Sequence, residues 1–138
     1  MPQRDAFHAT ARTALERDGW TITADPLVLQ VGRHNLFVDL GAERLLAAER
    51  KEERIAVEVK SFVGRSEVAD LEQALGQYVL YRGLLRRSDP GRALVLALPE
   101  AVYDSLLTSE LGDVARAELG LAMMVFNPQE GVVRRWFL

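Results

Sequence analysis

The chain has 138 residues, 49% of them hydrophobic and 27% charged, with a formal net charge of −3 and no cysteine. This length favours one domain over residues 1–138, and the lack of cysteine excludes disulfide scaffolds, thiol catalysis and zinc sites with thiolate ligands. With two histidines in the chain, we expect any metal to bind through oxygen ligands, as Mg²⁺ and Mn²⁺ do. No apolar run reaches the length of a membrane span and no signal peptide is recognisable, so we expect a cytoplasmic protein without a membrane partner.

The first half of the chain is predicted to contain one helix followed by short strands. Residues 4–18 carry an apolar helical face that includes Ala11 and Leu15, and Gly19 is a natural helix end. Extended segments follow at 20–23, 27–31 and 35–40. Residues 44–49 and 54–60 flank a charged stretch, so we predict a β-hairpin whose turn is centred near Glu52.

The second half is predicted to alternate helices and strands. Ser66 is a helix N-cap, and the helix that it begins runs to about Arg87. Further elements are a doubly buried strand at 92–98, a helical region at 99–119, a strand at 121–126, a turn at 127–131 and a last strand at 132–138. This order predicts a mixed α/β fold, with a mixed sheet flanked by helices.

The segment IAVEVKSF at 55–62 carries the clearest chemical signal. Side chains alternate along a strand, so Glu58 and Lys60 lie on the same face of an otherwise apolar strand, and Lys60 is one of only two lysines in the chain. One interpretation is a solvent-exposed strand with a local ion pair. The other is a metal-dependent phosphodiester-cleaving site, in which Glu58 binds Mg²⁺ and Lys60 holds the attacking water or the developing negative charge.

A magnesium site requires a second acid near Glu58, because one carboxylate rarely suffices. In the predicted hairpin register, Arg44 lies opposite Lys60, so Glu43 stands level with the pair at the end of the neighbouring strand. Asp39, four residues earlier, reaches the same place if the strand at 35–40 bends inward. Both acids therefore remain candidates.

Four segments together carry a family resemblance: DGWTITADPL (18–27), DLGAERLLAAER (39–50), IAVEVKSFVGRSEV (55–68) and DLEQALGQYVLYRGLL (70–85). They resemble the PD-(D/E)XK nuclease superfamily and, within it, the XisH-type excision controlling factors of the fdxN element. The resemblance implies a restriction-endonuclease-like α-β-β-β-α-β core with Mg²⁺ or Mn²⁺ as cofactor. It also implies that Glu58 and Lys60 form the family's E-x-K signature, with Glu43 or Asp39 as the preceding acid.

Three helical residues are further candidates by the same resemblance. Glu16 is similar to the helical glutamate that many members turn toward the metal, although a solvated role is an equal alternative. Gln77 and Tyr81 have a Q-x-x-x-Y spacing that places them on one helix face, as in the RecB-like branch. The alternatives are a buried amide bonded to backbone for Gln77 and simple packing for Tyr81, while Asp25 before Pro26 is a turn residue and a minor site candidate.

Two arginine-containing regions carry weaker predictions. The cluster Arg82, Arg86, Arg87 and Arg92 is either a phosphate-binding edge or a solvated helix end. The terminal segment 134–138, RRWFL, either packs against the sheet or contacts another subunit, so a homo-oligomer is one prediction.

The resemblance implies two functions of different classes. The first is a Mg²⁺-dependent endonuclease that acts in DNA rearrangement or element excision, with Gln77 positioning Lys60 or a phosphate. The second is a non-catalytic regulatory protein on the same fold that binds DNA or a partner and controls a recombinase. Both imply DNA, a recombinase and a XisI-type companion as partners, although the net negative charge gives no global support for DNA binding. A third reading, a structural module without a site, leaves Lys60 unexplained.

Overall fold

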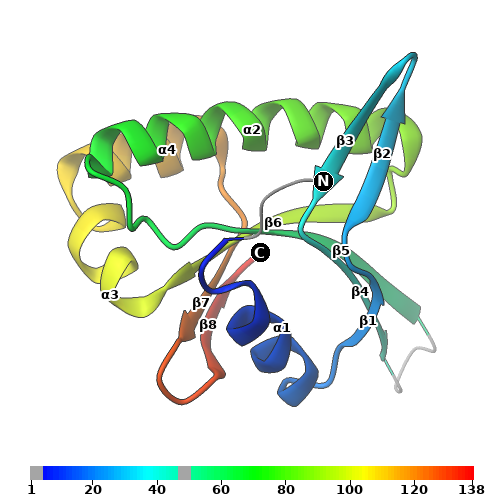
Figure 1. Cartoon of the computed structure of the whole chain (residues 1–138), viewed down its shortest axis with the longest axis horizontal. Coiled ribbons are helices and arrows are strands. Elements are labelled where there is room, and N and C mark those ends of the chain that lie inside the picture. The colour runs from blue at the N-terminus through cyan, green and yellow to red at the C-terminus, as the bar shows by residue number, and fades with distance from the viewer. Residues whose placement is uncertain (1–4, 47–50) are drawn as a thin grey trace.

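Six strands form one mixed sheet in the computed structural model, which describes residues 5–46 and 51–138 (Figure 1). In spatial order they are β1 (Thr21–Ala24), β4 (Leu40–Leu46), β5 (Lys51–Val59), β6 (Arg92–Pro99), β7 (Met123–Asn127) and β8 (Val132–Phe137). The β5–β6 and β6–β7 pairs are parallel, whereas β1–β4, β4–β5 and β7–β8 are antiparallel. Parallel neighbours need crossover connections, and helices supply both of them.

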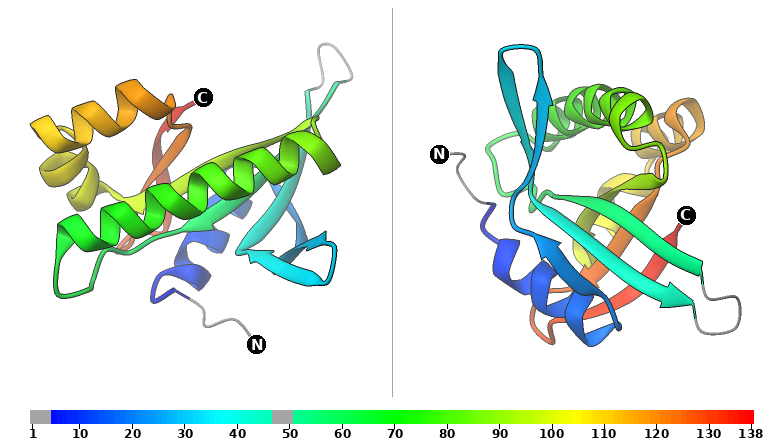
Figure 2. Two further views of the ribbon diagram at one scale, coloured as in Figure 1. Left: turned by 90° about the horizontal axis from the view of Figure 1, so that it is seen from above. Right: turned by 90° about the vertical axis from the view of Figure 1, so that its right-hand side faces the viewer.

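Helices cover both faces of this sheet (Figures 1 and 2). On one face lies α1 (His8–Arg17). On the other lie α2 (Glu67–Ser88), the short α3 (Glu100–Val102), the π-helical turn η1 (Tyr103–Leu107) and α4 (Glu110–Leu119). The predicted mixed α/β fold with a helix-flanked sheet is therefore confirmed. None of the described helices is long and apolar enough to cross a membrane.

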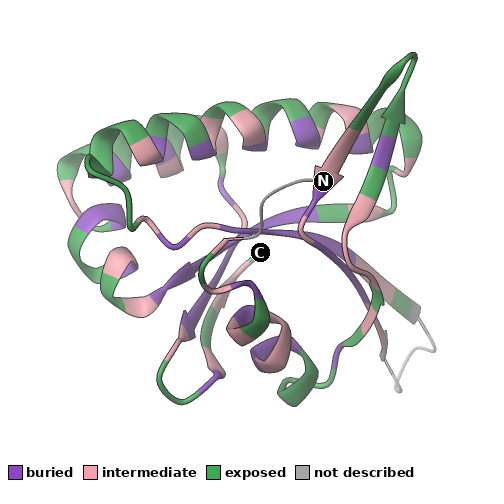
Figure 3. Cartoon of the chain, viewed as in Figure 1, coloured by how far each residue is buried: buried purple, intermediate pink, exposed green. Residues whose placement is uncertain are grey.

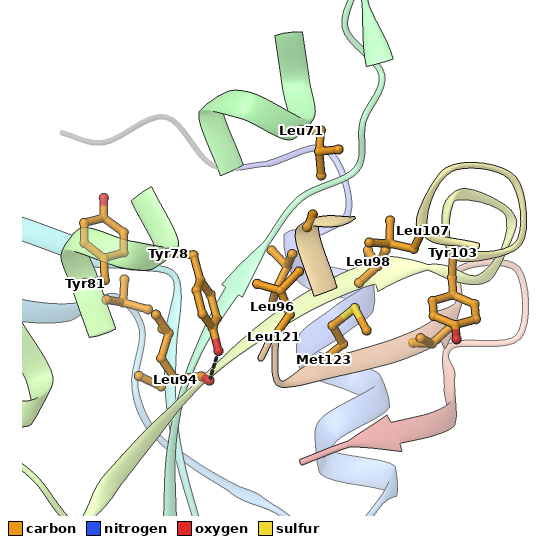
Figure 4. Packing of buried hydrophobic residues seen from close by; sticks show 14 of the residues in the cluster. Leu71, Tyr78, Tyr81, Leu94, Leu96, Leu98, Tyr103, Leu107, Leu121 and Met123 are labelled. Atoms are coloured by element: carbon orange, nitrogen blue, oxygen red, sulfur yellow. Dashed lines mark hydrogen bonds between the residues drawn. The ribbon is translucent and has the colours of Figure 1, made fainter. Parts of the chain in front are cut away.

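Two hydrophobic cores lie on opposite faces of the sheet. The α2 side buries leucines and aromatic residues, among them Leu96, Leu98 and Tyr78 (Figures 3 and 4). The Tyr78 hydroxyl donates to the carbonyl of Leu94 at 3.4 Å and accepts from the Ala122 N–H at 3.0 Å, so it fixes α2 to the sheet. The α1 side buries a second set of apolar residues, namely Leu15, Leu40, Val57, Val95 and Phe126 among others. β6 contributes to both cores, as the continuous apolar run at 92–98 predicts.

The predicted hairpin register is wrong. β4 begins at Leu40 and β5 at Lys51, so Arg44 pairs with Glu53 instead of lying opposite Lys60. Of the charged stretch read as a turn, residues 51–54 belong to β5, where the Arg44 guanidinium donates to Glu53 at 2.9 Å, and Arg50 lies outside the described residues. Cross-strand ion pairs of this kind allow a charged stretch to remain extended. Residues 47–49 of the predicted first arm lie outside the described residues.

Two other predicted elements also differ. The extended segment at 35–40 is divided between β3 (His34–Val38) and β4, and β3 pairs with β2 (Leu27–Val31) in a separate hairpin. The helical region at 99–119 is interrupted because Ser109 caps α4 by accepting from the Gly112 N–H at 3.3 Å. A Cβ at Gly112 would lie 2.3 Å from the Leu106 carbonyl oxygen, so only glycine fits this close turn.

The predicted N-cap at Ser66 is confirmed, since its hydroxyl accepts from the Ala69 N–H at 3.2 Å.

Candidate metal and phosphodiester site

Glu58 and Lys60 project from the end of β5 toward the α2 side of the sheet. Their neighbours in the strand, Val57 and Val59, pack on the α1 side, so the alternation of a β-strand puts the two charged side chains on one face. Lys60 Nζ lies 3.7 Å from Glu58 Oε2. The Glu58 side chain is only 7% exposed, which rules out the interpretation as a solvent-exposed strand with a local ion pair.

Asp39 is the acid that the fold brings to this pair. It connects β3 to β4, and its own N–H donates to Glu58 Oε1 at 3.2 Å. In return, Asp39 Oδ2 accepts from the N–H of Val59 at 2.7 Å. One oxygen of each carboxylate is therefore held by backbone, which fixes both side chains, and the second oxygens, Asp39 Oδ1 and Glu58 Oε2, accept no backbone hydrogen bond.

The pKa of Glu58 is strongly perturbed in this position. Burial, followed by the negative charge of Asp39 and a side-chain hydrogen bond with it, raises the pKa of Glu58 from 4.5 to about 8, against the opposing effect of Lys60. The pKa of the Tyr81 hydroxyl is also raised, mainly by burial and then by the charges of Glu58 and Asp39. Tyr81 therefore lies within the field of the acid pair, and a site with excess negative charge favours a proton or a cation.

The donor set fits a hard divalent cation. The carboxylates of Asp39 and Glu58 offer oxygen ligands, which Mg²⁺ and Mn²⁺ prefer, and Mg²⁺ commonly keeps several waters beside one or two carboxylates. Within residues 5–46 and 51–138, no group of three or more His, Asp or Glu side chains is close enough together to hold a metal. Water or substrate oxygens would therefore have to complete the coordination of any ion held by Asp39 and Glu58.

The inner face of α2 adds polar groups next to this pair. A pocket of about 170 Å³ is lined by Lys60 and Ser61 at the end of β5 and by Gln73 of α2, among others. Gln77 follows Gln73 by one turn and precedes Tyr81 by one turn, so the three side chains share a face of the helix. The Gln77 Oε1 atom is buried and accepts no hydrogen bond from the described residues. This acceptor is therefore available to a donor such as an ammonium group or a ligand.

The start of α1, on the other face of the sheet, contacts the same site through His8. His8, at the start of α1, is 4% exposed, and its Nε2 is 2.8 Å from Asp25 Oδ1. Asp25 Oδ2 accepts from the Arg12 guanidinium at 2.6 Å, and His8 Nδ1 lies 3.9 Å from Asp39 Oδ1. Sequence reasoning did not identify His8 as a site residue, although its spacing from Ala11 and Leu15 places it on the buried stripe of the helix.

A second N-terminal contact lies beside Lys60. Asp5 Oδ2 accepts from both the backbone N–H and the hydroxyl of Ser61, at 2.9 and 3.0 Å. The residues just before α1 therefore hold the strand end that carries Lys60. This contact was not predicted, since nothing in the local sequence pattern links residues 56 positions apart.

Two predicted acids are not brought to the site. Glu43 pairs with Arg54 across the strands and lies 3.5 Å from the guanidinium of Arg92, because the true register moves it along β4 away from Glu58. Glu16 is 53% exposed at the end of α1 and lies 3.8 Å from Arg12 Nε, as its solvated alternative predicts.

The arginine cluster does not form one continuous edge. Arg92 donates to Asp89 and to the Ile55 carbonyl, both at 3.0 Å, and Arg82 donates to the Leu119 carbonyl at 2.5 Å. Both side chains therefore support the fold, whereas Arg86 and Arg87 are exposed in the last turn of α2.

The C-terminal segment packs on its own chain. The ring centroids of Trp136 and Trp20 are 5.7 Å apart, and those of Phe137 and Tyr103 are 5.1 Å apart. Of the two predicted alternatives for this segment, packing against the sheet accounts for Trp136 and Phe137, while Leu138 is 73% exposed.

Comparisons with known proteins agree on one family. A family model described as "XisH protein" matches residues 1–134. A crystal structure of an XisH family protein from Nostoc punctiforme PCC 73102 is 40% identical, with a TM-score of 0.87, and the match covers 97% of this chain and 100% of that one. A crystal structure of a fdxN element excision controlling factor protein from Anabaena variabilis is 38% identical, with a TM-score of 0.88 and coverage of 98% and 100%. No curated protein matches the chain.

Proposed function

We propose that this chain, which belongs to the XisH family, takes part in the excision of a DNA element and does so with a divalent-cation-dependent site for phosphodiester cleavage. The observation that carries the proposal is the convergence of Asp39, between β3 and β4, with Glu58 and Lys60 at the end of β5, both carboxylates being fixed by backbone hydrogen bonds. The proposal is also supported by the raised pKa of Glu58, because two carboxyl groups in contact favour either a proton or a cation between them.

The proposed roles follow from the carboxylate oxygens that accept no backbone hydrogen bond and from the polar groups next to them. Asp39 Oδ1 and Glu58 Oε2 would hold Mg²⁺ or Mn²⁺, which when bound lowers the pKa of a coordinated water and neutralises phosphate charge. The Lys60 ammonium, next to Glu58, would orient the attacking water or donate to a phosphate oxygen. The unpaired Oε1 of Gln77 would accept from the Lys60 ammonium and keep it directed at the substrate.

Membership of the PD-(D/E)XK superfamily is part of the same proposal. In support of it, Asp39, Glu58 and Lys60 follow the order acid, E-x-K along the chain. The elements α1, β1, β4, β5, α2 and β6 follow the α-β-β-β-α-β order, with the β2–β3 hairpin as a separate two-stranded sheet between β1 and β4. The excision function is supported by the Anabaena variabilis relative, which is described as a fdxN element excision controlling factor. We extend the proposal to DNA as substrate, and to a recombinase and a XisI-type companion as partners.

A non-catalytic regulatory role is the second candidate. The observation in its favour is that only two carboxylates converge within the described residues, fewer ligands than a self-sufficient metal site offers. In this case the acid pair would serve as a site for binding or stability, and control of excision would depend on contacts with DNA or another protein.

Metal binding tests the proposal at its first step. Isothermal titration calorimetry with Mn²⁺ and Mg²⁺ should show binding to the wild-type chain, and Asp39→Asn and Glu58→Gln should abolish it. Glu43→Gln is the matched control, since it removes a carboxylate from β4, the strand next to Glu58, and should leave binding unchanged. Absence of Mn²⁺ binding at millimolar concentration, or equal loss in Glu43→Gln, would contradict the assigned site.

Cleavage separates the two candidate functions. If the site is catalytic, Lys60→Ala should retain Mn²⁺ binding but lose cleavage of DNA that carries the excised element's boundary. If the chain regulates without turnover, the wild type should bind the metal but leave this DNA intact, alone and with the companion and recombinase added.

A further inference from the structure

An apolar groove lies between α2 and α4, away from the acid pair. Its walls are Val68, Leu71 and Leu75 of α2 and Leu111, Val114 and Leu119 of α4, and its volume is about 300 Å³. We call this surface the α2–α4 groove. The two helices lie next to each other on the same face of the sheet in both views of Figure 2.

The groove exposes more apolar surface than isolated side chains would. Val68, Leu111 and Val114 are 48%, 44% and 56% exposed, and they line one depression from both sides. Single exposed apolar residues are ordinary, but a contiguous apolar depression with a polar margin is typical of an interaction surface. Leu71 is 2% exposed and belongs to the core, so the groove has a rigid floor.

The margin of the groove is acidic. Glu72 and Glu118 line it, one from each helix, and none of its lining residues is basic. Glu67 and Glu110, which start α2 and α4 beside Val68 and Leu111, are exposed as well. This arrangement selects a partner with positive charge on both sides of an apolar stripe.

We propose that the α2–α4 groove binds an amphipathic helix of a partner protein, with apolar side chains on one face and Lys or Arg beside them. Val68 to Leu75 and Leu111 to Leu119 each span about two helical turns, so the groove accepts two or three apolar anchors at i, i+3 or i+4, and i+7. A helix packed between two others is a common way to bury such a stripe.

The charge of the margin disfavours other occupants. A second copy of this chain, docked groove to groove, would bring Glu72 and Glu118 against their own counterparts. DNA and anionic membranes carry the same sign of charge as this margin and would be repelled. A basic partner is the occupant that satisfies the apolar walls and the acidic margin together.

The groove and the candidate site lie on different sides of α2. Asp70 and Gln73 of α2 line the pocket that contains Lys60, whereas Leu71 and Leu75 of the same turns line the groove. A partner helix in the groove would therefore pack directly on the helix that carries Gln73 and Gln77. The proposal itself is independent of metal binding or catalysis.

A pair of synthetic helical peptides tests this inference on the full chain. Both have Leu at i, i+3, i+4 and i+7, and the flanking positions are Lys in one and Glu in the other. We expect the Lys peptide to shift the amide NMR signals of Leu75 and Val114, and the Glu peptide to bind about tenfold more weakly or worse. Equal affinity for the two peptides would overturn the charge argument.

Two variants locate the binding. Val114→Ser should weaken binding of the Lys peptide about tenfold, because a buried valine in the complex is worth about that factor. Val79→Ser is the matched control: Val79 is 46% exposed on α2 but outside the groove, and its substitution should change nothing. Equal effects of the two substitutions would overturn the assignment.

Charge reversal provides a test that leaves the apolar packing intact. Glu72→Lys combined with Glu118→Lys should reverse the preference and make the Glu peptide the tighter ligand. Sedimentation of the wild type and of Val114→Ser completes the test. A wild-type dimer that dissociates in the variant would show that a second copy fills the groove, and this result would overturn the proposal.

Discussion

The buried acid pair predicts an unusual dependence of stability on pH. Burial and the charge of Asp39 raise the pKa of Glu58 in the folded chain to about 8, from an ordinary value of 4.5. A carboxyl group with a raised pKa in the folded state binds its proton more tightly there than in the unfolded state. Its contribution to stability is therefore complete below pH 4.5 and is lost as the pH rises toward 8.

The size of the effect follows from the shift. Each unit of pKa difference corresponds to about 1.4 kcal/mol, so the free energy of unfolding falls by about 5 kcal/mol between pH 4.5 and pH 8, where Glu58 releases its proton in the unfolded chain but retains it in the folded one. The effect is large because Glu58 is 6% exposed, so water solvates its charge poorly. A loss of this size is a substantial fraction of the stability of a small domain.

Glu58→Gln isolates this contribution. The amide keeps the shape of the protonated carboxyl group, accepts from the Asp39 N–H through its oxygen and donates to the Asp39 carboxylate, but it does not titrate. We expect urea denaturation in EDTA to show a wild-type stability that falls from pH 5 to pH 8, and a Glu58→Gln stability that falls much less. The variant should therefore be the more stable protein at pH 8.

The test compares how much the free energy of unfolding changes with pH in the wild type and in Glu58→Gln. Groups remote from Glu58 titrate alike in both proteins, so their contributions cancel in the difference, which reports Glu58 together with its interactions with Asp39 and Lys60. Glu16→Gln, at an exposed glutamate, is the control and should follow the wild type. If wild type and Glu58→Gln lose the same stability between pH 5 and pH 8, Glu58 is not protonated in the folded chain at neutral pH, and the argument from burial and Asp39 is refuted.

Three further predictions concern the scaffold, each checked by urea denaturation. Leu96→Ala should cost about 3 kcal/mol, because Leu96 is fully buried and the cavity cannot collapse; a cost below about 1 kcal/mol would contradict rigid packing there. Arg92→Ala should cost about 2 kcal/mol, since its guanidinium bonds Asp89 and a backbone carbonyl, whereas exposed Arg86→Ala should cost less than about 0.5 kcal/mol; equal costs would argue against a structural role. Ser109→Ala should cost about 1 kcal/mol through loss of the α4 cap, and no change would mean that the cap is dispensable.

The parts of the site that follow a local period could be predicted from the sequence. Glu58 and Lys60 share a face because strand side chains alternate, and this holds in any pairing of the strand. The choice between Asp39 and Glu43 depended instead on the register of β4 against β5. That register could not be read from the chain, because a charged strand end and a polar turn have the same composition.

The contributions of tertiary packing could not be predicted at all. His8 is positioned by Asp25 and lies near Asp39, and Asp5 caps the end of β5 through Ser61, in each case across a wide separation in sequence. Sequence periodicity indicates that His8 is buried, but not which group it faces. The mixed sheet was predictable because its apolar runs and helix starts are each defined by neighbouring residues.

The Asp5 contact has a practical consequence for handling the protein. Removing the first eight residues deletes no proposed metal ligand, yet it releases Ser61 from Asp5 and leaves Asp25 without His8. A chain shortened in this way would also lose Phe7, which packs against Phe126 in the α1-side core, so both this core and the position of Ser61 next to Lys60 would be affected. Affinity tags are therefore better fused to the C-terminus, where Leu138 is exposed, than joined closely to Asp5.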